Sequence, residues 1–178
     1  LRLGRWCGNP AHADVWQQTS PGFAAKPILA ELTGSATAQA DWINLSDGGH
    51  FENLGVYELV RRRCRFILVT DAGCDPDYEF EDLANLIRKC WTDFGVDIRF
   101  QSFDPMHRTP DSRYCCCHGA VGRIRYPDGP EGVILYAKSA LTGDEDPDIR
   151  QYADAHKEFP HETTADQFFD ENQFEAYR

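Results

Sequence analysis

Positive charge is scarce in this sequence of 178 residues. Its 18 lysines and arginines stand against 29 aspartates and glutamates, which gives a formal net charge of −11. A nucleic-acid-binding protein generally needs a basic face that neutralises phosphates, so the composition argues against such a partner. Long apolar runs are missing as well, since none approaches the roughly 20 residues that cross a bilayer. Any membrane anchor of the protein is therefore expected outside this sequence.

A disulfide framework is not evident either. The seven cysteines are odd in number and are scattered through apparent strands and helices. This pattern favours a reducing compartment, and we predict a cytoplasmic protein. Cys115, Cys116 and Cys117 are consecutive and precede His118, which suggests a zinc site. However, neighbouring residues of a strand point to opposite faces, and a second pair of ligands is not evident. We therefore favour small hydrophobic strand residues over zinc ligands.

One stretch has the most informative pattern in the chain. An apolar run at 42–45 leads into a turn-forming stretch at 46–55, which contains Asp47 followed by two glycines. An amphipathic segment at 56–63 follows, and then a continuous apolar run at 66–69. The pattern predicts a right-handed β-α-β unit whose second strand is buried on both faces of a parallel sheet. Ligands bind beyond the carboxyl ends of such strands, which is where Asp47 is expected.

The rest of the sequence contains helices and strands without internal repeats. A helix over 80–94 is the clearest, because its apolar residues recur at helical spacing and Gly95 ends it. Two strands, at 114–126 and 133–138, form a hairpin around a Pro-Asp-Gly-Pro turn. We thus predict an α/β fold with a mostly parallel sheet, flanked by helices, and an antiparallel hairpin at one edge. The remaining expected elements are a helix that ends before Gly34, a strand at 96–103, a helix at 144–159 and a C-terminal helix opened by a Thr164-x-x-Gln167 capping box.

The stretch around Asp47 also resembles a known family. The residues Asp47-Gly48-Gly49, the spacer to Asn53, the helix and the strand that ends in Asp71-Ala72-Gly73 are similar to the catalytic-aspartate segment of patatin-like acyl hydrolases and cytosolic phospholipases A. Phe159-Pro160-His161 and the phenylalanine-rich tail resemble the end of bacterial members of the family. The resemblance covers residues 42–178, which we interpret as the C-terminal part of such a domain. Residues 1–41 would form its irregular leading segment.

The resemblance implies hydrolysis of a lipid acyl ester, with phospholipid or lysophospholipid as the expected substrate. The family uses a serine–aspartate dyad, without histidine, metal or organic cofactor. By resemblance, Asp47 is the general base, and Gly48 and Gly49 shape its turn. Asn53 holds a position that is asparagine in the family too, and it also suits a helix N-cap. Gly55 stands where the family often has proline, so the helix is expected to begin a residue or two later.

The family's nucleophile lies earlier in its chains, in a Gly-x-Ser-x-Gly elbow preceded by a glycine-rich oxyanion loop. None of the six serines here stands in that pattern. We therefore expect this sequence to be the C-terminal half of a larger enzyme and to be inactive alone, with the serine supplied by a missing N-terminal half. The alternative is a non-catalytic interaction or regulatory module, which is favoured if this chain is the entire protein.

The chemistry of Asp47 leaves further alternatives open. Asp-Gly-Gly is ordinary turn chemistry, and an aspartate of ordinary pKa, about 3.9, is a weak base, so a catalytic Asp47 is expected to be partly desolvated. His50 is interpreted as a solvated or packing residue that at most binds substrate or modulates Asp47. Asp47 and Asp71 are expected to end successive parallel strands, where two carboxylates can hold Mg²⁺ for phosphoryl transfer. Against this, the sequence lacks a glycine-rich phosphate loop with lysine, and Asp71 also suits a turn cap.

A basic run at 61–65 ends the first predicted helix. Cations at a helix C-terminus are favoured by the helix dipole, and this is the interpretation we prefer. The alternative is a patch that meets anionic phospholipid head groups at a membrane surface.

Overall fold

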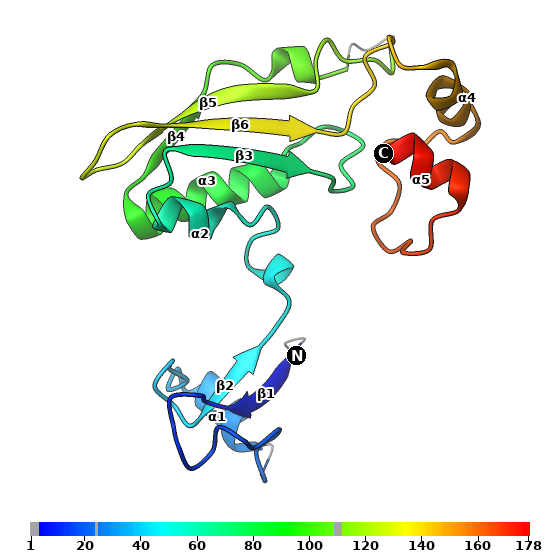
Figure 1. Ribbon diagram of the computed structural model, residues 1–178. Helices are drawn as coiled ribbons and strands as arrows, with labels where there is room; N and C mark the ends of the chain where they lie inside the picture. The colour runs from blue at the N-terminus through cyan, green and yellow to red at the C-terminus, as the bar shows by residue number, and fades with distance from the viewer. Residues whose placement is uncertain (1–3, 24, 109–111) are drawn as a thin grey trace. The chain divides into compact units, whose positions relative to one another are not determined.

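The computed structural model describes residues 4–23, 25–108 and 112–178. The chain divides into two compact units, Leu1–Asn53 and Leu54–Arg178, which are described here separately (Figure 1). Residues 1–41 were predicted as the leading segment of a domain that continues to residue 178, and the first unit comprises these residues together with the Asp47 stretch up to Asn53. Among the described residues, no helix is long and apolar enough to cross a membrane.

The first unit is built on two short strands, β1 (Arg5–Gly8) and β2 (Trp42–Leu45). They pair antiparallel, with Arg5 opposite Leu45 and Gly8 opposite Trp42. The side-chain amide of Asn9 donates to the carbonyls of Ala38 and Ala40, at 2.9 and 2.7 Å, and so fixes the chain that enters β2. The expectation that residues 42–45 pair within a parallel sheet is therefore wrong, because their partner comes from the segment that had no predicted strand.

Helix α1 (Ala25–Leu32) is the helix of this unit, and it ends before Gly34 as expected. Gly34 has a φ of +68°, a left-handed conformation that glycine adopts without steric cost. After β2, a 3₁₀ turn, η1 (Gly48–His50), occupies the stretch that was predicted to turn sharply.

The second unit contains a mixed four-stranded sheet in the order β3-β6-β5-β4. Strands β3 (Phe66–Asp71) and β6 (Gly132–Lys138) are parallel, whereas β6 and β5 (Gly119–Arg125) are antiparallel, as are β5 and β4 (Asp97–Phe100). The α/β class is thus confirmed, but a mostly parallel sheet is not observed, since one of three strand pairs is parallel. The β5–β6 hairpin is present as predicted, yet it forms the middle of the sheet, because β3 adds beside β6.

Two helices, α2 (Val56–Arg61) and α3 (Glu81–Phe94), lie on one side of this sheet (Figure 1). Helix α3 matches its prediction and ends at Gly95, whose φ of +63° lets its N–H reach the carbonyls of the last helical turn. Helix α2 begins after Gly55, so the later start is confirmed, and Asn53 is not its N-cap. The core between helices and sheet includes Val56, Val60, Leu83, Leu86, Cys90, Ile67, Val69, Ile124, Ile134 and Tyr136.

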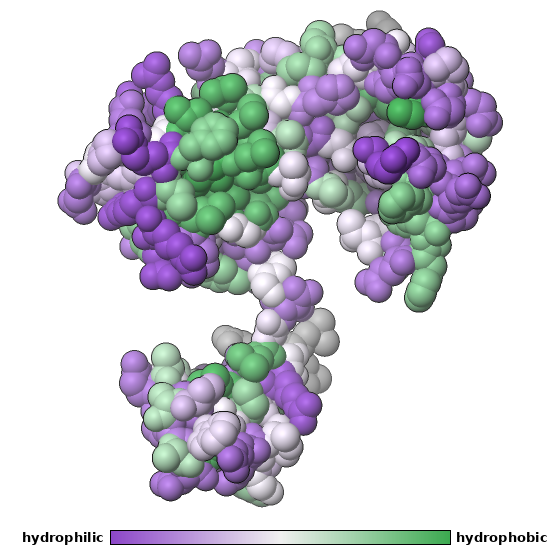
Figure 2. All heavy atoms as spheres, in the orientation of Figure 1, coloured by the Kyte–Doolittle hydropathy of each residue, from purple (hydrophilic) through white to green (hydrophobic). Residues whose placement is uncertain are grey.

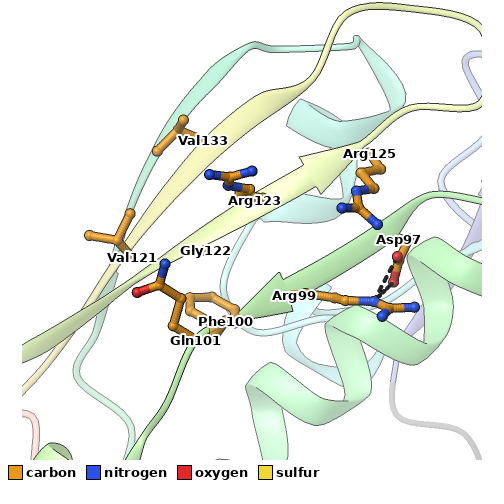
Figure 3. Close-up of a pocket in the computed structure, with 9 residues that line it drawn as sticks. All are labelled: Asp97, Arg99, Phe100, Gln101, Val121, Gly122, Arg123, Arg125 and Val133. Carbon is orange, nitrogen blue, oxygen red and sulfur yellow. Dashed lines mark hydrogen bonds and ion pairs between the residues drawn. The ribbon is translucent and has the colours of Figure 1, made fainter.

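The other face of the sheet is open. Residues of β3 alternate between exposed and buried, so that Phe66 is 67% and Leu68 58% exposed. The prediction of a strand buried on both faces is therefore wrong. Figure 2 shows apolar atoms gathered over the strands of this unit. A hollow of about 390 Å³ lies on this sheet. Figure 3 shows the residues that line it, among them Arg99, Arg123, Arg125, Val121 and Val133.

The C-terminal part contains α4 (Pro147–Ala155) and α5 (Glu171–Tyr177). Ala176 and Tyr177 of α5 pack against a small cluster formed by Leu141, Tyr152, Ala153 and Phe159. Helix α4 ends four residues earlier than predicted. The expected capping box at Thr164 does not form. Instead, the Asp170 side chain accepts the N–H of Gln173 at 2.8 Å, so α5 begins only at Glu171. A second 3₁₀ turn, η2 (Asp104–Met106), precedes β5.

Candidate functional site

Asp47 lies in the first unit, two residues beyond the end of β2, as the N-cap of η1. Its Oδ1 accepts the N–H of Gly49 at 3.0 Å, which fixes the carboxylate against its own turn. The side chain is exposed, so the partial desolvation expected of a catalytic Asp47 is not observed in this unit. The local geometry is that of an aspartate-initiated turn, in which the side chain substitutes for a backbone acceptor.

The two glycines after Asp47 have different roles. A Cβ at Gly49 would lie 2.7 Å from Oδ1 of Asn53, so the Asn53 side chain needs a residue without a Cβ here. A Cβ at Gly48 would meet nothing within 4 Å. The structure therefore places Asp47, Gly49 and Asn53 in one turn, and it gives no steric reason for glycine at position 48.

His50 faces the backbone of this turn. Its Nδ1 lies 3.3 Å from the carbonyl oxygen of Asp47 and 3.3 Å from Oγ of Ser46. No hydrogen bond between the imidazole and the Asp47 carboxylate is present in the described part of the chain. The ring is exposed, which agrees with a solvated residue and not with a triad histidine.

A second polar group of residues, the Asp71 cluster, lies at the carboxyl ends of β3 and β6. It comprises the buried residues Asp71, Tyr136, Lys138 and His161 and the partly buried Asp75. Lys138 Nζ lies 3.0 Å from Oδ2 of Asp71, and the Tyr136 hydroxyl donates to the same oxygen. The other oxygen, Oδ1, accepts the N–H of Gly73 at 2.8 Å, which confirms that Asp71 caps its turn. Burial, followed by the hydrogen bond to Asp71, raises the pKa of Tyr136 far above its ordinary value.

Asp75 holds the loop that follows β3. Its two carboxylate oxygens accept the N–H groups of Glu79 and Phe80, at 2.8 and 3.1 Å, and Lys138 Nζ lies 3.4 Å away. Burial raises the pKa of Asp75, but these amide donors and the lysine outweigh it and keep the pKa below its ordinary value. Tyr78 and Phe80 adopt positive φ values of 55° and 54°, which are uncommon for bulky residues. The carboxylate therefore stabilises a backbone conformation that the loop would otherwise avoid.

His161 closes the cluster from the C-terminal segment. Its side chain is 5% exposed, and its Nδ1 accepts the N–H of Asp75 at 3.4 Å. The Cys74 thiol donates to the His161 carbonyl at 3.0 Å, and the ring stands edge-on to Tyr78. Burial, followed by the charge of Lys138, lowers the pKa of His161, so the imidazole is neutral at neutral pH. With Nδ1 as an acceptor, the proton resides on Nε2, which has no hydrogen-bond partner among the described residues.

The premise of the two-carboxylate magnesium site is not observed. Asp47 follows β2 and Asp71 ends β3, and these strands belong to different sheets. The Asp71 carboxylate is engaged by Gly73, Tyr136 and Lys138. Within the described ranges, no group of three or more His, Cys, Asp or Glu residues is arranged to hold a metal ion.

The three consecutive cysteines and the basic run are ordinary surface and loop features. Cys115 is buried and Cys116 exposed, and they lie in a loop before β5, not in the strand that was predicted. In the basic run, Arg61 pairs with Glu58 at 2.8 Å and Arg63 with Asp128 at 3.6 Å. These ion pairs agree with a basic run that ends a solvated helix. The alternative, that the run contacts anionic phospholipid head groups, stays a prediction.

Sequence reasoning missed most of the Asp71 cluster, although one signal was present. In β6, the alternation that buries Ile134 also points Tyr136 and Lys138 inward. A lysine at an inward position requires a buried carboxylate partner, and Asp71 stands at the end of a predicted strand. No such pattern marks His161, since it comes from an irregular segment far along the chain.

Comparison with models of protein families, with characterised proteins and with solved structures gives no match to this chain. The interpretation of both polar sites therefore depends on their geometry and on the sequence pattern.

Proposed function

We propose that this chain is the C-terminal part of a patatin-like lipid acyl hydrolase and that Asp47 is its general base. The observation that carries the proposal is the state of the Asp47 carboxylate. Gly49 orients one oxygen, and the other, Oδ2, has no hydrogen-bond partner among the described residues of the first unit. A base needs a fixed carboxylate with an accessible lone pair, and Asp47 has both, whereas Asp71 has neither oxygen available.

The proposed reaction uses a serine from outside this sequence. Oδ2 of Asp47 accepts the serine hydroxyl proton while the serine oxygen attacks the acyl carbonyl. When the ester bond breaks, the aspartic acid returns the proton to the leaving alkoxide, which leaves as an alcohol. A water molecule then loses a proton to Asp47 and attacks the acyl-enzyme. As the acyl–serine bond breaks, Asp47 returns this proton to the serine oxygen, which releases a fatty acid and restores the serine. Donors for the oxyanion also belong to the serine-bearing part.

The exposed state of Asp47 is consistent with a base whose strength depends on assembly. A carboxylate in water has a low pKa, and removal of water by bound lipid or by the serine-bearing part raises it. The proposed substrate is a phospholipid or lysophospholipid, as the family resemblance implies. A carboxylate that becomes basic only under a lipid avoids deprotonating the serine before the substrate is present.

The test is ester hydrolysis by the full-length protein that carries this chain, native and Asp47→Asn. A short-chain p-nitrophenyl ester and phosphatidylcholine vesicles are the two substrates. Asp47→Asn keeps the size of the side chain and the acceptor for Gly49 but removes the base, so kcat is expected to fall by about 10²–10⁴-fold. Asp14→Asn, an exposed change in the same unit, is the matched control and is expected to leave kcat unchanged.

Two further outcomes bear on the alternatives. Full activity in Asp47→Asn would show that this aspartate is only a turn residue. Absence of hydrolysis in the native full-length protein, with both substrates, would favour the non-catalytic module. The chain of 178 residues alone is expected to hydrolyse neither substrate, because it lacks the nucleophile.

A further inference from the structure

The open face of the four-stranded sheet has an apolar part and a cationic part. One row across the four strands runs from apolar to cationic side chains and consists of Phe66, Val133, Arg123 and Arg99. The next row along the strands is apolar and consists of Leu68, Leu135 and Val121. In the described part of the second unit, both helices that pack on the sheet, α2 and α3, lie on its other side (Figure 1). A contiguous apolar face that meets water is typical of an interaction surface.

The cationic part of this face lacks a full set of counter-ions. Arg99 and Arg123 stand directly opposite each other on β4 and β5, and like charges in such positions destabilise a strand pair. Arg99 pairs with Asp97 at 2.8 Å, whereas Arg123 has no carboxylate partner among the residues that the structure describes. Both arginines line the hollow on this face (Figure 3). A partner with negative charge would relieve the repulsion between them.

The same chain contains a segment of complementary chemistry, residues 166–178, which we call the acidic Phe segment. It has four aspartates and glutamates and one arginine. Its three phenylalanines are exposed, and the side chain of Phe168 is 93% exposed. Glu171, the first residue of α5, is exposed and has no cationic partner in the described ranges. The segment therefore presents apolar rings beside unpaired negative charge.

The acidic Phe segment does not cover the sheet of its own chain. Figure 1 shows α5 beside α4, beyond the carboxyl ends of β3 and β6. The Tyr177 ring lies 4.9 Å from the Phe159 ring, measured between centroids, and Gln173 Nε2 donates to Glu162 at 2.9 Å. These contacts hold one side of the segment, while Phe168 and Phe174 remain exposed to a second molecule.

We propose that two copies of this chain associate, with the acidic Phe segment of one copy on the open sheet face of the other. The phenylalanines bury apolar surface against the rows that contain Leu68 and Phe66, which provides the affinity. Glu171 and its acidic neighbours meet Arg123, which orients the segment on the sheet. The contact joins two different surfaces, so it is head-to-tail. It does not depend on the role of Asp47, because both surfaces belong to the second unit.

The first experiment is sedimentation velocity of the chain of 178 residues over a wide range of concentration. A species larger than the monomer is expected to grow with concentration. Added salt is expected to weaken the association, because it screens exposed charges. A chain that stays monomeric at every concentration would overturn the proposal.

Substitutions on the two surfaces test which residues meet. Leu68→Gln on the sheet and Phe168→Gln on the segment are each expected to weaken association by about tenfold or more, because an apolar anchor is lost. Leu32→Gln removes a leucine that is 78% exposed in the first unit, and this control is expected to associate like the native chain. Circular dichroism checks that each variant is folded. Association that Leu68→Gln leaves unchanged would exclude the sheet face.

Charge reversal tests the electrostatic part of the contact. Arg123→Glu is expected to weaken association by about tenfold, since it places a carboxylate against an acidic segment. Arg88→Glu changes the net charge equally but lies exposed on α3, on the other side of the sheet, and is expected to have little effect. Equal effects of the two variants would show that net charge alone controls association, which contradicts the proposed contact.

Mixing two variants tests the head-to-tail arrangement. The Leu68→Gln chain keeps an intact segment, and the Phe168→Gln chain keeps an intact sheet face. A mixture of the two is therefore expected to associate at concentrations at which neither associates alone. If Phe168→Gln alone associates like the native chain, two sheet faces pair with each other and the segment is not the occupant.

The same sedimentation experiment with the full-length protein that carries this chain tests another occupant. Association that Leu68→Gln and Phe168→Gln weaken there as well supports the proposal. Association of the chain of 178 residues that is absent in the full-length protein would show that another part of that protein covers the sheet face, and the proposal would fail.

Discussion

Asp47 and Asp71 stand in the same local setting but in opposite environments. Each follows or ends a strand, and each accepts the N–H of a glycine two residues later, at 3.0 Å from Gly49 and 2.8 Å from Gly73. The Asp47 side chain is exposed, whereas Asp71 is 5% exposed and bonded to Lys138 and Tyr136. The same turn chemistry therefore serves an accessible carboxylate in one unit and a structural ion pair in the other.

The difference arises from the neighbouring strand. Asp71 ends β3 beside β6. The inward-facing residues Tyr136 and Lys138 of β6 bind Oδ2 of its carboxylate. Asp47 follows β2, whose partner is β1, and no such donors meet it in the described part of the first unit. An Asp-x-Gly turn alone thus does not separate a candidate base from a structural residue. The residues on the neighbouring strand determine whether the aspartate is accessible or structural. Substitutions in the two turns test this through their effect on unfolding free energy.

The largest effect is expected for Asp71→Asn. The change removes the charge that pairs with Lys138 at 3.0 Å in a buried site, and it leaves the ammonium with Asp75 alone. Breaking a buried ion pair from one side costs about 3–5 kcal/mol of unfolding free energy. Urea unfolding of the native and variant chains measures the loss. The double change Asp71→Asn with Lys138→Met is expected to be less destabilised than Asp71→Asn, since no buried ammonium remains that has lost its Asp71 partner.

A smaller loss of unfolding free energy is expected as the pH falls, and it arises from the Asp71 cluster. The pKa of His161 is lowered from 6.5, chiefly by burial, so below pH 6.5 the unfolded chain binds a proton that the folded chain does not. Unfolding free energy therefore falls as pH drops from 6.5, by at most about 1.4 kcal/mol per pH unit. The carboxyl of Asp75, with its pKa lowered from 3.8, loses its stabilising contribution only in stronger acid.

The check is urea unfolding at several pH values between 6.5 and about 5.5, compared with His161→Gln, which has no proton to bind. A flatter pH dependence in the variant is expected. An equal dependence of unfolding free energy on pH in both chains would show that protonation of His161 does not control stability in acid. The buried cluster would then not differ from the exposed turn in its response to pH.

Local sequence pattern was sufficient for elements whose causes lie close in the chain. Helix α3 was predicted because its apolar residues and Gly95 act within a few turns, and the β5–β6 hairpin because its turn residues join adjacent strands. The partner of β2 was not predictable in this way, since β1 lies at the opposite end of the first unit's sequence and has no alternating pattern. The position of β3 beside β6 likewise depends on a long-range pairing.

The same reason explains the partial prediction of the sites. The hydrogen bond between Asp47 and Gly49 is local, so a turn at Asp47 was predictable from the sequence, whereas the position of Asn53 beside Gly49 was not. The Asp71 cluster joins residues from β3, β6 and the C-terminal segment, and its members meet only after folding. The continuous apolar run of β3 predicted burial on both faces, whereas Leu68 is exposed because α2 and α3 cover one side only.

A modest change in stability is expected when the glycines of the exposed Asp47 turn are replaced by alanine. Gly49→Ala places a Cβ 2.7 Å from Oδ1 of Asn53, so Asn53 must move, and a loss of about 1 kcal/mol is expected. Gly48→Ala meets nothing within 4 Å and is expected to be neutral or slightly stabilising, because the unfolded chain loses freedom. Thermal unfolding of the two variants measures the difference. Equal losses would show that the Asn53 contact does not define the turn.

The smallest effect is expected for Asp47→Asn, which is the counterpart of Asp71→Asn. Asparagine keeps the side-chain oxygen that accepts from Gly49, and the exposed charge has no partner in the described residues of its unit. Surface changes of this kind alter unfolding free energy by less than about 0.5 kcal/mol. Urea unfolding of both variants under one condition provides the test. A loss for Asp47→Asn as large as that for Asp71→Asn would mean that Asp47 is held by a buried partner, and the distinction between an accessible base and a structural aspartate would fail.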